Sequence, residues 1–113
     1  MLRGEVWCGV VWWVEFDPAA VSEIRKTRPG VIVSNNSANR NLSRVILVPL
    51  TGNTDRLYPG EAHVSVAGKE SKAMADQLMT ADKVRLTSRI DVLSKADLLA
   101  VELAMRVQLG LPI

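Results

Sequence analysis

The sequence predicts a mainly β domain: a small, strongly bent sheet or partly open barrel, closed by one C-terminal helix. Three observations lead to this prediction. Short β-branched runs, separated by polar stretches, recur along the chain. Residues 62–66 alternate between apolar and polar, which is typical of a half-buried strand. Only the last segment has helical spacing. At 113 residues the chain has the length of one domain, residues 1–113.

The first predicted strand is the apolar run Val6 to Val14, "VWCGVVWWV". It has nine residues, whereas a membrane helix needs about 20. Its β-branched and tryptophan content favours a strand. We therefore predict no membrane span.

Two further strands are predicted from β-branched runs at Val31–Val33, which follows Pro29-Gly30, and at Val45–Leu50. Residues 34–44, "SNNSANRNLSR", have the asparagine and serine content of a loop. In residues 62–66 the pattern turns His63 to solvent. Residues 73–79 and 90–93 are weaker strand candidates.

The C-terminal helix is predicted from its caps and its apolar stripe. Ser94 followed by Asp97 resembles a capping box, and Gly110 and Pro112 supply the stop. The apolar residues fall mostly on one helical stripe: Leu98, Val101, Leu103, Met105 and Leu109.

Composition narrows the possible functions. Apolar residues make up 48% of the chain and charged residues 23%, and the formal net charge is only +2. A general polyanion binder is thereby disfavoured, so any nucleic-acid contact must rely on local clustering of cations. A single cysteine, Cys8, forms no internal disulfide and favours a reducing compartment. With one histidine and one cysteine we predict no metal site and no cofactor.

The segment "SEIRKTRP" places Arg28 directly before Pro29. Proline forces the preceding residue toward extended geometry, so Arg28 is held by rigid backbone at a strand start or edge. A guanidinium held in this way offers a planar fork that matches phosphate oxygens. The alternative is a solvated loop in which Glu23 pairs with a loop cation, and periodicity alone favours that alternative.

An ordered set of segments makes the phosphate-binding interpretation of Arg28 the stronger one. The segments are "RGEVW", "WVEFDP", "SEIRKTRP", "VIVSNN", "VPLT", "YPGE", "ADQ" and "TADKVRLTSRI". In order and spacing the set resembles the MazF/PemK family of toxin endoribonucleases, over nearly the whole chain. The resemblance implies an SH3-like or CcdB-like barrel with a C-terminal helix. It also implies a metal-independent, cytoplasmic toxin of a toxin-antitoxin module that cuts single-stranded RNA at short preferred sequences.

The resemblance also implies site residues. The family's catalytic arginine falls on Arg28 and its threonine on Thr51, which by itself would be read as a strand-end residue bonding a nearby turn. The implied reaction is attack of a ribose 2′-hydroxyl on the adjacent phosphate, leaving a 2′,3′-cyclic phosphate and a 5′-hydroxyl. Arg28 would stabilise charge and could donate a proton, and Thr51 would hold a non-bridging oxygen. Glu23 is the weaker candidate for accepting the 2′-proton, with a loop ion pair as its alternative role.

RNA contacts are expected at two places. Ser22, Arg25 and Lys26 lie in the stretch that resembles the family's specificity loop. Asp76 and Gln77 match its "(D/E)Q" pair, where an acceptor and an amide can read base edges. Ordinary strand-edge polarity is the competing interpretation of that pair.

The chain departs from the family pattern in three ways. About five residues are inserted around Cys8–Val11, so the first strand is expected to bulge at Gly9 or to slip its register. Val21 replaces the loop's usual glycine. Met74 stands where one branch of the family has an additional arginine, so a mechanism that relies on that arginine does not transfer.

The expected partners are single-stranded RNA, a second copy of the chain in a homodimer, and a cognate antitoxin. The antitoxin is expected to be a small DNA-binding protein with a largely acidic, partly disordered segment that covers the RNA groove. Two alternative functions remain. A CcdB-like toxin that poisons DNA gyrase needs a tryptophan-glycine-isoleucine ending, whereas this chain ends "LGLPI". An inactive barrel that only binds antitoxin is the other.

Overall fold

A computed structural model of the chain describes residues 6–16 and 27–113. Seven strands in this part of the chain join in one sheet. In chain order the elements are β1 (Val10–Glu15), β2 (Thr27–Ile32), α1 (Asn36–Asn41), β3 (Arg44–Thr51), β4 (Glu61–Val66), β5 (Lys69–Met74), the 3₁₀ turn η2 (Ala75–Gln77), β6 (Met79–Asp82), the 3₁₀ turn η3 (Lys83–Arg85), β7 (Leu86–Val92) and α2 (Lys95–Leu109). The predicted mainly β fold with a C-terminal helix is confirmed.

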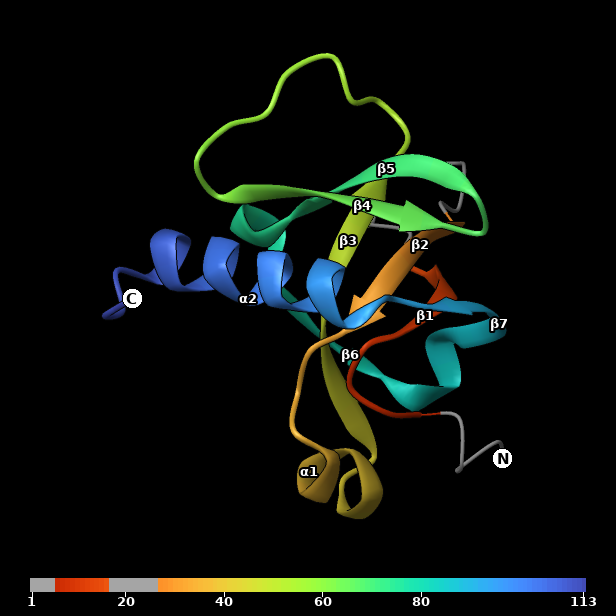
Figure 1. The fold of residues 1–113 in the computed structure, drawn as a ribbon. Coiled ribbons are helices and arrows are strands. Elements are labelled where there is room, and N and C mark those ends of the chain that lie inside the picture. Colours follow the sequence, from red (N-terminus) through yellow and green to blue (C-terminus); the bar gives the residue numbers. More distant parts are fainter. Residues whose placement is uncertain (1–5, 17–26) are drawn as a thin grey trace, which may run out of the picture.

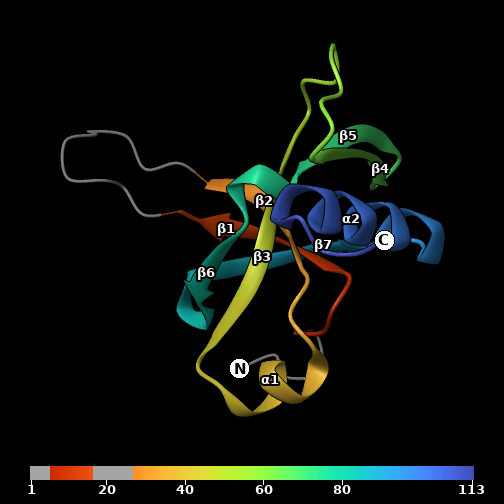
Figure 2. The same ribbon diagram turned by 90° about the vertical axis from the view of Figure 1, so that its left-hand side faces the viewer.

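The sheet is antiparallel, bent and closed on one side by a helix. Its strand order is β4-β5-β3-β2-β1-β7, and β6 pairs with β3 outside that path. In Figure 1 the β4–β5 hairpin and the helix α2 lie together, while α1 lies at the far end of β3. Figure 2 shows the same sheet from the side, with β1, β2 and β3 crossing its centre.

Strand β3 changes partners along its length. One of its edges pairs with β2 through Leu47, Val48 and Pro49. The other edge pairs first with β6, up to Leu47, and then with β5 at Leu50 and Thr51. One strand is therefore shared by two parts of the sheet, which bends around it.

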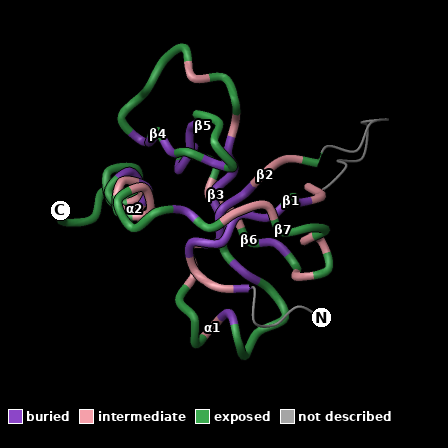
Figure 3. The backbone as a smooth tube through the Cα atoms, turned by 45° about the vertical axis from the view of Figure 1, so that its right-hand side comes forward, coloured by how far each residue is buried: buried purple, intermediate pink, exposed green. Residues whose placement is uncertain are grey.

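Two apolar cores fill the two faces of this sheet. The larger core includes Val48, Leu50 and Val101 and lies between the sheet, the β4–β5 hairpin and α2. The smaller core includes Trp12 and Leu47 and lies on the opposite face. Figure 3 shows the buried stretches meeting where β1, β2 and β3 cross. Side chains alternate between the faces of a strand, so neighbouring residues of β3 enter different cores.

The first strand is shorter than predicted. It begins at Val10, because Gly9 turns the chain with a φ of +95° that glycine adopts at little cost. Gly9 is held on both sides, since its N–H donates to Ile32 O at 2.7 Å and its carbonyl accepts from Leu93 N at 2.9 Å. The expected register irregularity lies further on, where the β1–β7 ladder shifts between Val11 and Trp12 and again between Trp13 and Val14.

The loop predicted at residues 34–44 contains the short helix α1, so that prediction was wrong. Asn35 caps the helix, its side chain accepting from Ala38 N at 2.8 Å. Asn39 is buried and donates to Ser34 O at 2.8 Å. The same asparagines and serines that are typical of a loop can also cap and brace one helical turn.

The strand predicted over residues 73–79 was placed wrongly. Strand β5 starts earlier, at Lys69, and ends at Met74; η2 follows, and β6 begins at Met79. The charged residues of β5 gave no apolar alternation by which to recognise it. Residues 90–93 lie mostly within β7, as predicted, and His63 is exposed, as predicted.

Helix α2 begins and ends as the sequence predicts, but fewer of its apolar side chains are buried than predicted. Ser94 Oγ accepts from Asp97 N at 3.1 Å, and Gly110 ends the helix with a left-handed φ of 69°. Val101 is buried, but Leu103 and Leu109 are exposed, contrary to the predicted stripe. None of the helices in the described ranges has the length and apolar character that a membrane crossing requires.

Two carboxylates join the outer edge of the β4–β5 hairpin to the other side of the sheet. Asp97 of α2 accepts from Ser65 N at 2.9 Å, and Asp91 of β7 accepts from Ala67 N at 2.7 Å. The hydrogen bonds from the backbone of Ala67 and Val92 lower the pKa of Asp91 below its ordinary value of 3.8. These bonds satisfy edge N–H groups that would otherwise be open to pairing with another chain.

We predict that Asp91 stabilises the fold only where it is ionised. Folding lowers its pKa, so its contribution is present above pH 3.8 and is lost as the pH falls through the lowered value. Asp91→Asn should reduce the free energy of unfolding by about 1 kcal/mol at pH 7, a modest value because the carboxylate is near solvent. Urea unfolding from pH 7 to pH 3 should show this difference shrinking. Asp55→Asn, with the same charge change on an exposed loop, is the control.

Candidate active site

Arg28 and Thr51 lie at the same end of two adjacent strands. Arg28 pairs with Val14 of β1. On its other side, the pairing of β2 with β3 ends at Gly30↔Pro49, and Arg28 and Thr51 each lie two residues beyond that pair. Side chains alternate along a strand, so Arg28 has the orientation of Gly30 and Thr51 that of Pro49. Directly opposed residues share a face of the sheet. Both side chains therefore leave the sheet on the face that holds the smaller core, at its rim.

The two groups are free to meet a ligand. Arg28 is half-buried, and within the described ranges its side chain makes no hydrogen bond or ion pair. The Thr51 hydroxyl oxygen accepts a hydrogen bond from Asn53 N at 3.2 Å. This is the bond expected of a strand-end threonine that stabilises the turn after it. That bond uses the oxygen as an acceptor, so the hydroxyl proton remains available for donation.

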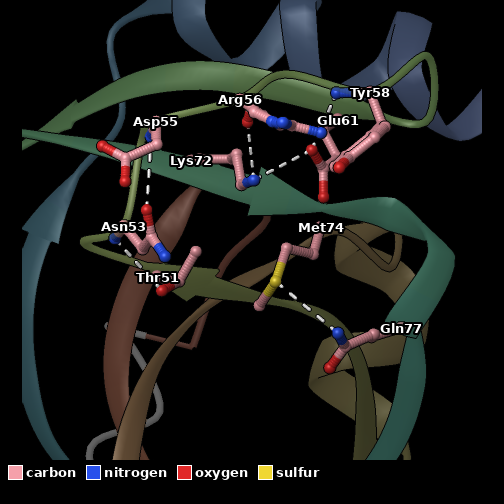
Figure 4. Close-up of polar contacts among 9 residues, drawn as sticks. All are labelled: Thr51, Asn53, Asp55, Arg56, Tyr58, Glu61, Lys72, Met74 and Gln77. Carbon is pink, nitrogen blue, oxygen red and sulfur yellow. Dashed lines mark hydrogen bonds and ion pairs between the residues drawn. The ribbon is translucent and has the colours of Figure 1, made fainter.

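A buried lysine lies beside Thr51 on the next strand. Lys72 of β5 is the cross-strand partner of Thr51 and is only 8% exposed. Its Nζ lies 3.0 Å from Glu61 Oε1, donates to Arg56 O at 2.7 Å, and lies 5.7 Å from the centre of the Tyr58 ring. Figure 4 shows this ammonium reaching from the sheet to the loop above it.

The carboxylate of Glu61 is held ionised by these neighbours. Burial acts to raise its pKa, but the Tyr58 N–H, at 2.9 Å from Oε1, and Lys72 outweigh burial and lower the pKa below its ordinary value of 4.5. The Glu61 carboxylate is thus ionised at neutral pH. It connects β4, β5 and the loop between β3 and β4.

The pair Asp76-Gln77 forms the exposed η2 turn after β5. Gln77 Nε2 donates to Met74 Sδ at 3.6 Å, so its amide is directed back toward the end of β5 (Figure 4). Met74 itself is buried and occupies the place where one branch of the family has an arginine. Thr51, Lys72 and Met74 share one face of the sheet, because Lys72 pairs with Thr51 and Met74 lies two residues further along β5.

Four of the predicted site residues, Ser22, Glu23, Arg25 and Lys26, lie outside the described residues. The structure brings Arg28 and Thr51 to one rim and puts Gln77 nearby, across Met74. The catalytic and binding roles of all these residues stay predictions. Among the described residues, no group of three or more His, Cys, Asp and Glu side chains is arranged to hold a metal ion.

Sequence reasoning missed the Lys72–Glu61 pair. In "KESKAM" Lys72 lies two residues after Glu70, so both are expected on the same polar face of the strand, exposed to solvent. Its burial depends on the β3–β4 connection, where Arg56 and Tyr58 contact its ammonium group. No local pattern marks that event, although a lysine next to a run of buried alanine and methionine is a weak signal.

Comparison with known proteins identifies the family. The sequence pattern of the PemK-like, MazF-like toxins of type II toxin-antitoxin systems matches residues 8–109. The chain belongs to this family. It is 33% identical over 120 residues to Endoribonuclease MazF9 of Mycobacterium tuberculosis, covering 98% of each chain.

Solved structures of other proteins show the same fold as this MazF-like toxin. An endoribonuclease from a mycobacterial species superposes with a TM-score of 0.80 at 25% identity, covering all of this chain and 99% of the other. A second mycobacterial endoribonuclease, solved in complex with its cognate antitoxin, has a TM-score of 0.79 at 27% identity, with 95% and 97% coverage. The bent sheet and C-terminal helix are therefore the architecture of the family.

We predict that removing Lys72 alone destabilises the toxin strongly. Lys72→Met leaves the half-buried Glu61 carboxylate without its counter-charge and with only the Tyr58 N–H as a donor, which should cost about 1–3 kcal/mol in urea unfolding. Lys72→Met with Glu61→Gln removes both charges while the amide can still accept from Tyr58 N, so most of that loss should be recovered. Equal losses in the single and double variants would show that the charge pairing is not the cause.

Proposed function

We propose that this single domain, residues 1–113, cleaves single-stranded RNA at short preferred sequences and leaves 2′,3′-cyclic phosphate and 5′-hydroxyl ends. Membership of the MazF-like toxin family supports the activity. The observation that carries the proposal for the site is the strand register that directs Arg28 and Thr51 to one rim. RNA cleavage would inhibit translation and growth.

The chemistry needs few groups, because the nucleophile is already part of the substrate. The 2′-oxygen must be set in line with the phosphorus and the extra negative charge stabilised. Arg28 stabilises that charge with its planar fork of donors and cannot accept the 2′-proton, since guanidinium is already fully protonated. The departing 5′-oxygen takes up a proton, from water or through the Arg28 donors, and leaves as the 5′-hydroxyl. Thr51 donates its hydroxyl proton to a non-bridging oxygen.

The proton of the 2′-hydroxyl needs an acceptor, and Glu23 is our candidate. Glu61, the carboxylate paired with the Thr51 neighbour Lys72, is already engaged by that lysine and by the Tyr58 N–H. A carboxylate bound in this way is a poor base, because its donors favour the ionised form. Ser22, Arg25, Lys26, Asp76 and Gln77 are proposed to bind the RNA on either side of the cut.

The proposal includes the partners. A mycobacterial structural relative was solved with its cognate antitoxin, and we propose a cognate antitoxin for this chain, together with a homodimeric state. The toxin would act in the cytoplasm, where cellular RNA is found. A lone cysteine, Cys8, supports this location, since it forms no internal disulfide.

The activity is tested with long single-stranded RNA of mixed sequence in excess chelator. Discrete cuts with 5′-hydroxyl ends are expected, because none of the proposed steps uses a metal. If RNA of varied sequence stays intact, or if the products carry 5′-phosphates, the proposed reaction is wrong.

The site residues are tested separately. Arg28→Ala and Thr51→Ala should each lower the rate of cutting by at least about 100-fold, the cost of removing one preorganised donor. Circular dichroism should be unchanged. Arg44→Ala and Thr80→Ala, at the opposite end of β3 and on its neighbour β6, are matched controls and should keep full activity. Full activity in either site variant contradicts the role given to that residue.

A further inference from the structure

The connection between β3 and β4, residues 52–60, exposes an aromatic and a cationic side chain next to Thr51. Tyr58 is 54% exposed and Leu57 49%, and Arg56 is exposed as well. By contrast, Trp12 of β1 is only 2% exposed. In Figure 1 this connection arches away from the sheet at the end where β3 finishes.

Hydrogen bonds hold this connection at both ends. Asn53 N donates to Thr51 Oγ1, and Asp55 N donates to Asn53 Oδ1 at 3.2 Å. At the other end Gly60 O accepts from Ala75 N at 3.0 Å. Gly60 is packed so closely against α2 that an added Cβ would meet the Gln108 side chain.

The middle of the 52–60 connection is held by one side chain of β5, that of Lys72. The ammonium donates to the Arg56 carbonyl, faces the Tyr58 ring and pairs with Glu61, which in turn accepts the Tyr58 N–H. Three of these contacts act on the backbone or ring of Arg56 and Tyr58: the bond to the Arg56 carbonyl, the contact with the Tyr58 ring and the bond from the Tyr58 N–H. The pair therefore fixes where Arg56 and Tyr58 stand relative to Thr51.

Stability alone does not account for such a pair. An apolar pair of similar volume is often as stable as a buried ion pair, because desolvation offsets the attraction between the charges. An apolar pair would not bind the Arg56 carbonyl, however. What the ion pair adds is the orientation of the segment above it.

We propose that Lys72, with Glu61, is a positioning pair that holds Arg56–Tyr58 as an RNA-binding arm beside Thr51. This inference rests on the proposed function and deepens it. Single-stranded RNA is bound by cations that follow its backbone and by aromatic rings on which bases stack. Arg56 supplies the cation and Tyr58 the ring, for a nucleotide flanking the scissile phosphate.

The test uses variants that keep the fold. Lys72→Met with Glu61→Gln avoids an unpaired buried charge but removes the donor to Arg56. Its KM for RNA cleavage should rise about tenfold, the scale of losing one base stack, while kcat stays within about twofold. Thr51→Ala should instead lower kcat. Lys69→Met with Glu70→Gln makes the same charge change on exposed positions of β5 and should leave KM unchanged.

A double-mutant cycle separates positioning from general loss of structure. Arg56→Ala with Tyr58→Ala should raise KM by a similar factor, and combining all four substitutions should raise it no further, because Lys72 acts through Arg56 and Tyr58. Multiplied effects, about a hundredfold in the quadruple variant, would overturn the proposal. An unchanged KM would also overturn the proposal. That result is expected if Arg56–Tyr58 binds antitoxin and not RNA.

Affinity for an uncleavable RNA keeps the two hypotheses distinguishable. A 2′-O-methylated single-stranded RNA of mixed sequence is titrated against the same proteins. If the wild-type chain cuts RNA but all variants bind this probe equally, the arm is wrong and the proposed function stands. If the wild-type chain does not cut RNA, the proposed function falls, and an about tenfold loss of probe affinity in the Lys72 and Glu61 double variant still supports the arm.

Discussion

Leu47 and Val48 are neighbours on β3, and their side chains fill two different apolar cores, one on each face of the sheet. A strand that is buried on both faces must be apolar throughout and is held rigidly by its neighbours. Strand β3 meets this condition from Leu47 to Leu50 and then ends at the polar residue Thr51. The position of the proposed active site follows from where that burial stops.

The proposed active site at the end of β3 rests on a rigid backbone. Arg28 and Thr51 lie on strands whose register is fixed by core packing, so the backbone at both positions is already ordered before a substrate binds. The loop above them would be free by itself, since exposed connections are the mobile parts of a domain. Lys72 and Glu61 extend the rigidity of the sheet into that loop.

Local patterns predicted much of this architecture and missed particular parts of it for identifiable reasons. The strands at residues 45–50 and 62–66 and the caps of α2 were readable, because β-branching, alternation and capping residues act locally. The helix α1 was missed, since asparagine and serine serve loops and caps equally well. Strand β5 was missed because "KESKAM" has no apolar alternation, and Leu103 and Leu109 were expected in the core yet are exposed.

The sequence by itself determined the mainly β class, the C-terminal helix and, through its ordered motifs, the family and the candidate residues Arg28 and Thr51. Those properties reside in residue types and short spacings. Only the tertiary structure decided that Arg28 and Thr51 leave one face of the sheet and that Lys72 is buried against Glu61 beneath the 52–60 loop. Both depend on strand register and on a loop folding back over the sheet, which are set by contacts between residues far apart in the chain.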